Sequence, residues 1–369
     1  MSGLRVLDFS RAVSGPFAGR ILSDLGADVV KVEPADGDVS DRFGRVQGGR
    51  AALFAQMNAG KRNIGLDLRT AADSALAREL ADVADVVIEN FRTGVMDRLG
   101  LGFTSIAESN PRLVMLSISG FGALSPEAGR RAYAPVIHAE SGALVRQSRA
   151  HDVPLVDQSH SVADTLSALH GTIAVLAALR QRDATGRGTH IDLGMLQAVV
   201  ASDDHAHESL DGLSTVGEHW GHIYEGAGGP IMLAMSAPGL WRTLSRFADL
   251  DDGLGSDAPL EVKVATRSTV VHDWLTSFKD RSDMTTALES AGVGWADVRA
   301  PEDLLDQPTF RADPPFDEID DGDGGTRRVV RMPYRFDRDQ VHVVGRVAPS
   351  DSDRNDVVTD WLGPAAKER

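Results

Sequence analysis

The chain has 369 residues, of which 42% are hydrophobic, and its formal net charge at pH 7 is −16. This length and composition are typical of a globular protein with a large core and two domains. The negative charge argues against nucleic acid or an anionic membrane surface as a partner, but it allows a local basic pocket. The absence of cysteine excludes disulfides, thiolate–zinc sites and a thiol nucleophile.

The N-terminus has no charged segment followed by an apolar run, as a secretory leader would have. No apolar run in the sequence is expected to be long enough to span a bilayer. We therefore expect a cytoplasmic protein with no membrane partner.

Short apolar runs alternate with helical patterns from the N-terminus onward. Strands are expected at 4–9, 27–33, 63–68, 85–90 and 113–119, and helices at 16–25 and 71–80. Strands that alternate with helices predict an α/β fold with a large, open, mostly parallel, Rossmann-like sheet. No GxGxxG follows the first strand and no GxxxxGK[ST] is present, so the usual nucleotide phosphate loops are missing.

The pattern changes after about residue 204. A glycine-rich breaker at 226–230, a strand at 231–235, a helix at 240–248 and helical sequence at 269–292 predict a smaller α+β domain. The acidic, glycine-containing stretch 316–325 predicts a linker, and strand-like runs at 327–336 and 340–344 and a last helical turn at 357–362 follow it. We expect a large domain over 1–205, a small domain with its linkers over 206–315, and a return of 316–369 to the large domain.

The most informative stretch begins at Ser159 and opens a long helical pattern, which ends in a polar, glycine-rich turn at 182–188 before a strand at 189–193. Apolar residues recur at three- and four-residue spacing and form one stripe: Leu166, Leu169, Ile173, Leu176 and Leu179. Asp164 is expected in the first turn, where free N–H groups and the helix dipole favour an ionised carboxylate. Such a carboxylate either caps its helix or, when partly stripped of water, acts as a nucleophile toward an acyl group.

Basic residues lie near the predicted ends of the strands: Lys61, Arg62, Arg92, Arg98 and Arg131. Because ligands of open α/β sheets bind beyond the carboxyl ends of the strands, Arg92, Arg98 and Arg131 fit a phosphate-bearing ligand. The alternative is scattered surface charge.

Other catalytic and metal-binding patterns are weak or missing. Neither GxSxG nor HExxH is present, so a serine nucleophile elbow and a zinc protease site are excluded. The run from Asp203 to Glu208 contains metal-binding residue types, but His205 and His207 are only two residues apart on an expected helix. We therefore expect a polar helix end there, and no metal site.

An ordered series of motifs resembles the family III CoA-transferases, the superfamily of formyl-CoA transferase, carnitine CoA-transferase and α-methylacyl-CoA racemase. The series consists of Ser14-Gly15-Pro16, Leu25 to Glu33, Asn58 to Ile64, Glu89 to Val95, Asp97 to Gly100, Ser119 to Gly122, the Asp164 helix and Thr185 to Gly188. The resemblance extends over residues 3–200 and is weak beyond them.

This resemblance implies an interlocked homodimer, in which each chain threads through a ring in the other. It implies that coenzyme A or an acyl-CoA is a substrate, with no permanently bound cofactor, and that CoA lies along the strand ends of the large domain. Val13 would lie near the CoA chain and Leu66 and Leu68 would flank the adenine. The implied phosphate or pantetheine contacts are Arg98 and Arg131, with Arg92 at the same strand edge.

Asp164 matches the family's catalytic aspartate. The implied reaction moves CoA between an acyl-CoA and a small carboxylic acid through a mixed anhydride on Asp164. An acyl-CoA racemase or epimerase and a non-catalytic CoA-binding protein remain as alternatives. Racemases carry a histidine where this chain has Arg131-Ala132-Tyr133, and His138 lies one or two helical turns further on, so racemisation is disfavoured.

The middle domain is short and lacks the family's longer glycine-rich loop. The cluster at 226–229 is expected to be either a covering loop over the site or a domain linker.

Overall fold

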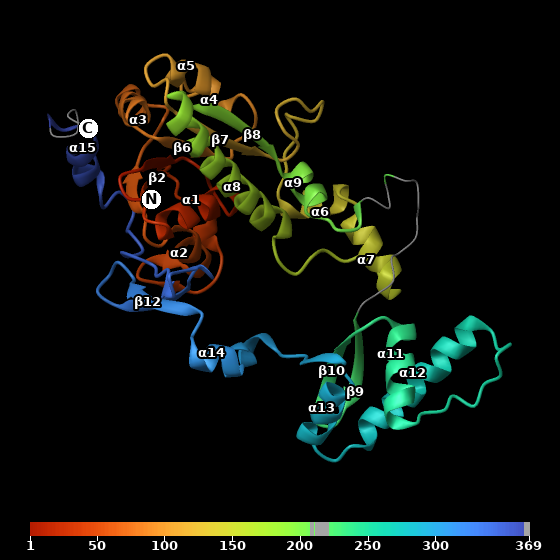
Figure 1. Cartoon of the computed structure of the whole chain (residues 1–369). Helices are drawn as coiled ribbons and strands as arrows, with labels where there is room; N and C mark the ends of the chain where they lie inside the picture. The colour runs from red at the N-terminus through yellow and green to blue at the C-terminus, as the bar shows by residue number, and fades with distance from the viewer. Residues whose placement is uncertain (207–209, 211–220, 365–369) are drawn as a thin grey trace. The chain divides into compact units, whose positions relative to one another are not determined.

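The computed structural model describes residues 1–206, 210 and 221–364. The chain divides into two compact units: residues 1–210 with 314–369, and residues 211–313 (Figure 1). The larger unit thus contains segments from both ends of the chain.

A six-stranded parallel sheet forms the centre of the larger unit, in the order β5-β2-β1-β6-β7-β8. The strands are β1 (Arg5–Asp8), β2 (Asp28–Glu33), β5 (Arg62–Gly65), β6 (Val86–Glu89), β7 (Val114–Ser119) and β8 (Thr189–Gly194). Counted in chain order, this is the doubly wound arrangement of Rossmann folds, so the predicted α/β fold with an open, mostly parallel sheet is confirmed. The strand order reverses between β1 and β6, which makes this pair the topological switch point.

Helices cover both faces of the sheet because neighbouring strand residues point to opposite sides. On one face, Val6 packs with α1 (Ser14–Asp24), α6 (Ala134–Glu140), α8 (Val162–Thr185) and α9 (Met195–Ala201). On the other face, Leu7 packs with α3 (Ala71–Asp82), α4 (Val95–Arg98), α5 (Phe103–Ala107) and α15 (Arg354–Leu362). The last helix, which contributes the buried Trp361, is longer than the single turn expected at 357–362.

Helix α8 buries mainly a different face from the apolar stripe, of whose five residues Leu179 is buried. Its buried residues are mostly small, and a Cβ on Gly171 would lie 2.9 Å from Leu116 of β7, so the helix approaches the sheet closely. Three residues of the stripe remain exposed: Leu169 at 39%, Ile173 at 64% and Leu176 at 39%. With a mean hydropathy of 1.5, α8 is also long and apolar enough to cross a membrane, so the expectation that no segment qualifies is wrong. Of its most apolar window, 44% is buried, and the helix packs on α1 and the sheet.

The acidic stretch 316–325 is part of a β-hairpin, so its prediction as a linker is wrong. β12 (Phe316–Asp320) pairs with β13 (Thr326–Val330), and Ile319 and Val329 bury against Phe54 of α2 (Ala52–Asn58). The acidic residues lie in the turn, where the Asp321 carboxylate accepts hydrogen bonds from the N–H groups of Asp323 and Gly325. The strand-like run 340–344 shortens to β15 (Asp339–Gln340), which pairs with β14 (Arg335–Phe336).

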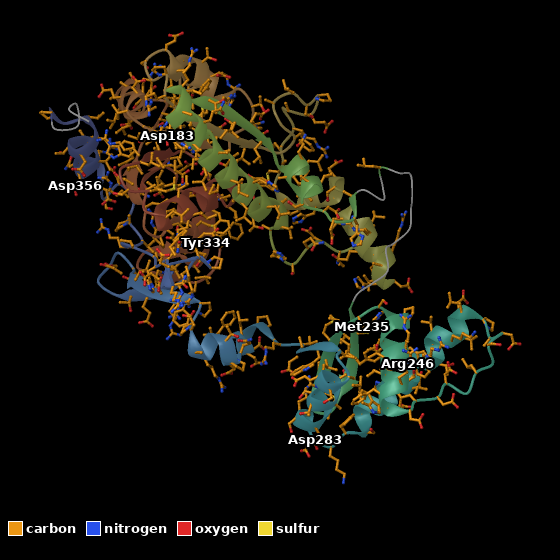
Figure 2. The ribbon with its side chains drawn as sticks, in the orientation of Figure 1. Asp183, Met235, Arg246, Asp283, Tyr334 and Asp356 are labelled. Atoms are coloured by element: carbon orange, nitrogen blue, oxygen red, sulfur yellow. The ribbon has the colours of Figure 1, made fainter. Side chains whose placement is uncertain are left out.

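The smaller unit is an α+β structure with its own core. Its antiparallel sheet has the order β11-β10-β9, and Ile231, Leu244 and Leu275 are buried between sheet and helices. Its elements are β9 (His222–Gly226), β10 (Gly229–Ala234), α11 (Ala237–Ala248), α12 (Leu260–Ser277), α13 (Arg281–Ser290), β11 (Gly294–Asp297), η2 (Pro301–Asp306) and α14 (Pro308–Ala312). Figure 2 labels Met235, which packs on this core.

The glycine cluster at 226–230 is the hairpin turn between β9 and β10, so its interpretation as a domain linker is wrong. Gly228 and Gly229 have φ values of 80° and 116°, which side-chain-bearing residues rarely adopt. The remaining elements, all in the larger unit, are η1 (Val39–Arg42), β3 (Val46–Gln47), β4 (Arg50–Ala51) and α7 (Ala143–His151).

Candidate active site

A cavity of about 420 Å³ lies at the switch point, where open α/β sheets bind their ligands. Besides Met195 and residues of the segments 36–42 and 128–133, four places contribute to its walls: the loop after β1, the loop after β6, the end of β7 and the start of α8. The residues from these four places are Arg11, Ala12, Ser14, Asn90, Phe91, Arg92, Ser119, Gly120 and Asp164. The cavity therefore joins the predicted nucleophile to the carboxyl ends of three neighbouring strands.

Asp164 lies in the first turn of α8, as the sequence predicts. Its carboxylate accepts hydrogen bonds from the hydroxyl and the backbone N–H of Ser14, the first residue of α1, so these bonds join it to another helix. Burial raises the pKa of Asp164 to about 6, against the opposing effect of the Ser14 bonds. The carboxylate is thus ionised at neutral pH while it has lost much of its hydration.

Asn90 fixes the loop that carries Ser14. Its side-chain oxygen accepts the N–H of Arg11 at 2.8 Å, and its amide nitrogen donates to the carbonyl of Arg11 at 2.7 Å and to the hydroxyl oxygen of Ser14 at 3.1 Å. The residue that follows β6 therefore anchors the loop that follows β1. Because the Ser14 oxygen accepts from Asn90, its proton is left to donate to Asp164.

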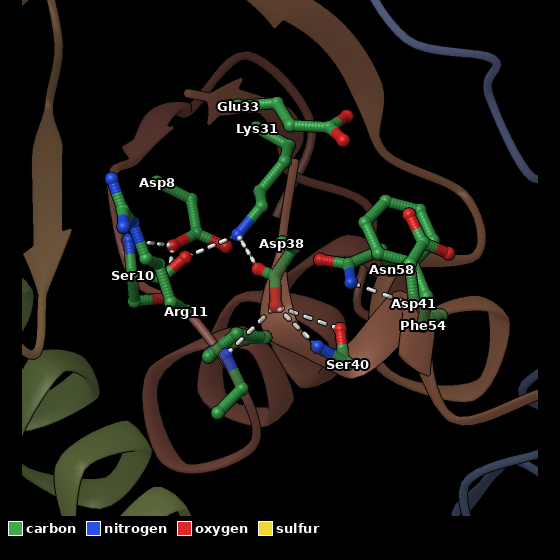
Figure 3. Close-up of polar contacts among 12 residues, drawn as sticks. Asp8, Ser10, Arg11, Lys31, Glu33, Asp38, Ser40, Asp41, Phe54 and Asn58 are labelled. Atoms are coloured by element: carbon green, nitrogen blue, oxygen red, sulfur yellow. Dashed lines mark hydrogen bonds and ion pairs between the residues drawn. The ribbon is translucent and has the colours of Figure 1, made fainter. Parts of the chain in front are cut away.

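A buried network of charged side chains also holds the loop after β1 (Figure 3). Asp38 accepts the N–H of Ala12 at 3.1 Å and pairs with Lys31 at 2.8 Å, which stabilises Ala12 at its unusual φ of 65°. Burial alone would raise the pKa of Asp38, but Lys31 and the N–H donors outweigh it and lower that pKa to about 2.

Lys61 pairs with Asp8 at 2.8 Å and also donates to the carbonyl of Pro16 at 2.8 Å. Both charged side chains are fully enclosed, and burial lowers the pKa of Lys61 to about 8 against the attraction of Asp8. Helix α1 can lie against this pair because residue 19 is glycine: a Cβ there would be 2.7 Å from a carboxylate oxygen of Asp8. Lys61 is therefore a structural residue, and Arg62 is another, since it pairs with Asp28 and Asp360.

A second cavity of about 470 Å³ adjoins the first, because Arg11, Asp36 and Phe91 line both. Leu66 and Leu68 are among its walls. The structure thus places the two leucines expected to flank adenine in one cavity and Asp164 in the neighbouring one.

Several arginines face these cavities without a carboxylate partner. Arg11 lies over the ring of Phe91, with 5.6 Å between its guanidinium carbon and the ring centre, and its buried Nε has no hydrogen-bond partner. Over the parts of the chain that the structure describes, Arg42 and Arg92 of the first cavity also form no ion pair. Arg130 differs, since it pairs with Glu127 and Glu140. Three unpaired guanidinium groups around one cavity favour an anionic ligand.

The structure separates the other predicted contacts into two groups. Arg92 lines the first cavity, and Val13 lies between two of its wall residues as the residue before α1. Arg98 and Arg131 are exposed and line neither cavity. No role was predicted for Arg11, Ser14 or Asn90, although Ser14 and Asn90 lie in motifs of the resemblance; their places in the segments that follow the two central strands were the signal that could have identified them.

No group of three metal-binding side chains is present among residues 1–206, 210 and 221–364. His207 and Glu208, from the run considered as a metal site, lie outside the described residues.

The comparisons with known proteins agree with this site. The sequence profile described as CoA-transferase family III matches residues 1–354. The beta subunit of succinyl-CoA–L-malate CoA-transferase from Chloroflexus aurantiacus is 31% identical over 295 residues, which are 75% of this chain and 73% of that protein. Succinate–glutarate CoA-transferase from Agrobacterium fabrum is 29% identical, over 92% of this chain and 91% of that protein.

Solved structures show the same likeness. Rv3272 from Mycobacterium tuberculosis has a TM-score of 0.82 at 27% identity, with 96% of this chain and 98% of that chain covered. A CaiB/BaiF family protein from Brucella suis has a TM-score of 0.78 at 27% identity, with the same two coverages. The chain therefore belongs to CoA-transferase family III. It is an acyl-CoA:carboxylate CoA-transferase.

Proposed function

We propose that this transferase moves CoA between an acyl-CoA and a small carboxylic acid with Asp164 as its nucleophile. The observation that carries the proposal is the Asp164 carboxylate itself, which lines the switch-point cavity and is aimed by two hydrogen bonds from Ser14. Its partial loss of hydration makes it a better nucleophile than an exposed carboxylate. The N-terminus of α1 adds its dipole on the same side of the carboxylate.

The reaction balances in four steps. A carboxylate oxygen of Asp164 attacks the thioester carbon, the C–S bond breaks, and a mixed anhydride and CoA thiolate result. The thiolate attacks the aspartyl carbon, which releases the first acid and leaves an aspartyl-CoA thioester. The acceptor carboxylate then attacks that thioester, which forms a second anhydride and again frees the thiolate. Attack of the thiolate on the acceptor carbon yields the new acyl-CoA and restores Asp164.

We propose that CoA occupies both adjoining cavities. Its adenine lies between Leu66 and Leu68, and its pantetheine arm passes Arg11 and Phe91 toward Asp164, so that the thioester reaches the first cavity. The unpaired Arg11 lines both cavities and can meet the phosphates where they join, while the unpaired Arg92 in the first cavity meets the thioester end of the arm. Val13 lies beside the arm, and Arg98 and Arg131 attract CoA from outside the cavity walls.

The names of the relatives suggest the first substrates to test. Several of them use succinyl-CoA or succinate together with a second dicarboxylic acid: L-malate, mesaconate, glutarate or D-citramalate. We propose a dicarboxylic acid as the acceptor here, because Arg42 of the first cavity has no carboxylate partner among the described residues and is left to bind a second carboxylate.

Racemisation gains no support from the site. It requires a second acid–base group facing the α-carbon. Within the described part of the chain, no histidine lines the first cavity, and Ala132 and Tyr133 occupy its wall near the position where racemases carry one.

We also propose that the protein is a homodimer. The exposed Leu169, Ile173 and Leu176 form an apolar stripe on α8, and a soluble chain gains stability by covering such a surface.

The test is the variant Asp164→Asn, assayed with succinyl-CoA and a panel of dicarboxylates. Asparagine caps a helix about as well as aspartate, so folding and CoA binding should persist while turnover falls by at least about a thousandfold. Asp183→Asn is the matched control, because Asp183 is exposed near the other end of the same helix (Figure 2). Turnover at the wild-type rate in Asp164→Asn would overturn the proposal.

A further inference from the structure

His138 is a buried residue that the proposed chemistry does not use. It belongs to α6, its side chain is 3% exposed, and it lies between a loop and the start of α8. Its Nδ1 is 2.8 Å from a carboxylate oxygen of Asp157, and its Nε2 is 3.1 Å from the backbone nitrogen of Ala163. It therefore connects α6, the loop before α8 and the first turn of α8.

These two contacts fix the protonation state of the imidazole. A backbone N–H can only donate, so Nε2 must accept from Ala163 and carries no proton. The ring proton is then on Nδ1, from which it is donated to Asp157. This hydrogen bond is also the largest cause of the lowered pKa of Asp157. His138 is thus a neutral imidazole in the Nδ1–H tautomer.

The bond to Ala163 replaces a missing helix cap. Ser161, at the capping position of α8, forms no side-chain cap bond. The N–H of Val162 is taken by the carbonyl of His160 at 2.8 Å, and His138 takes the next N–H, which immediately precedes Asp164. The orientation of this turn decides where the Asp164 carboxylate points.

We propose that His138 is a positioning residue: through Ala163 it holds the first turn of α8 so that Asp164 meets Ser14 and faces the cavity. The proposal rests on Asp164 being the nucleophile. A role that is merely structural would act through Asp157, by tethering the loop before α8. That loop has another tether, because the side-chain amide of Gln158 donates to Gln147 of α7 at 2.7 Å.

Two substitutions separate these roles, since each keeps one of the two contacts. The longer amide of His138→Gln reaches the place of Nε2 and can accept from Ala163, while the shorter amide of His138→Asn reaches only the place of Nδ1 and can donate to Asp157. We expect His138→Asn to lower kcat by about tenfold or more with KM for acyl-CoA little changed, because a displaced nucleophile loses its attack geometry. His138→Gln should stay within about threefold of the wild-type kcat. The opposite order, or equal losses, would overturn the proposal.

A second measurement does not depend on activity. Nitrogen-15 NMR of histidine-labelled protein, with the His138 signals identified by their loss in His138→Gln, should show a neutral Nδ1–H imidazole at pH 7. A cation or an Nε2–H tautomer would contradict the proposal even if both variants folded poorly. A wild-type enzyme without transferase activity would remove the proposed function instead, and the tautomer would still be decided.

Discussion

Two neighbouring regions of this protein differ in whether their charged side chains form ion pairs. In the buried network that holds the loop after β1, Asp38 pairs with Lys31 and Asp8 pairs with Lys61, and these side chains are at most 1% exposed. In the cavity that the same loop lines, Arg11, Arg42 and Arg92 have no carboxylate partner among the described residues. A buried unpaired charge is costly, so a satisfied network gives the loop one conformation. Unpaired guanidinium groups beside a cavity leave their hydrogen-bonding capacity for a ligand.

Breaking the network should have the largest effect on stability. Asp38→Ala should lower the free energy of unfolding by about 3–5 kcal/mol, because it leaves Lys31 buried and unpaired. Urea denaturation measures this loss. The double variant with Lys31→Met and Asp38→Leu should recover much of it, since neither charge then remains. A loss below about 1 kcal/mol in Asp38→Ala would show that the pair does not support the loop.

The exposed stripe on α8 gives the second prediction. Ile173→Asp should weaken self-association by at least about 2–3 kcal/mol, because it removes a large apolar contact and adds a charge that must be buried. Sedimentation across a dilution series measures the change, and Asp183→Asn on the same helix is the control. A compact wild-type particle of 39.4 kDa at nanomolar concentration would exclude the dimer itself.

The cavity arginines should affect ligand binding and leave stability nearly unchanged. Arg11→Gln and Arg92→Ala should each weaken CoA binding by about 1.5–3 kcal/mol, the range for a hydrogen bond to a charged group. Arg98→Ala and Arg131→Ala, which alter exposed side chains outside both cavities, should cost less than about 1 kcal/mol. Calorimetry with CoA measures all four, and larger losses for Arg98 and Arg131 than for Arg11 and Arg92 would place the phosphates elsewhere.

The smallest expected effect is a change with pH. Burial raises the pKa of Asp164 to about 6, and only its ionised form is nucleophilic, so kcat/KM should fall as the pH drops through this value. Glu89 titrates nearby, since burial raises its pKa to about 7, and Glu89→Gln removes that second titration. If kcat/KM of Glu89→Gln stays constant two pH units below the pKa of Asp164, the carboxylate is not the titrating nucleophile.

The sequence predicts much of the fold because local patterns decide it. Apolar runs such as 27–33 and 113–119 become strands of the parallel sheet, and Asp164 lies in the first turn of its helix as expected. The predictions are wrong where contacts between segments far apart in the sequence determine the secondary structure. The acidic stretch 316–325 becomes part of a hairpin because Ile319 packs on Phe54, which is far away in the sequence.

Like the fold, the candidate site can be predicted only in part from local sequence. The sequence places Asp164 at a helix start and the family resemblance implies its role, whereas Arg11 and Asn90 become meaningful only when β1 and β6 are adjacent in the sheet. The strand order, which no local pattern encodes, creates this adjacency. The apolar stripe on α8 misleads for a related reason: α8 packs through small residues such as Ala163 and Gly171, which let it approach α1 and the sheet closely.

The central claim is that Asp164 forms a covalent anhydride, and isotope transfer tests it most directly. The wild-type enzyme turns over succinyl-CoA with an acceptor acid labelled with oxygen-18 in its carboxylates, and the peptide containing Asp164 is then analysed by mass spectrometry. In the proposed reaction the acceptor's carbon keeps one of its labelled oxygens in the new thioester and leaves the other on Asp164. We therefore expect oxygen-18 in the Asp164 side chain after turnover, and none when acyl-CoA is omitted. Complete turnover with an unlabelled Asp164 would contradict the anhydride mechanism.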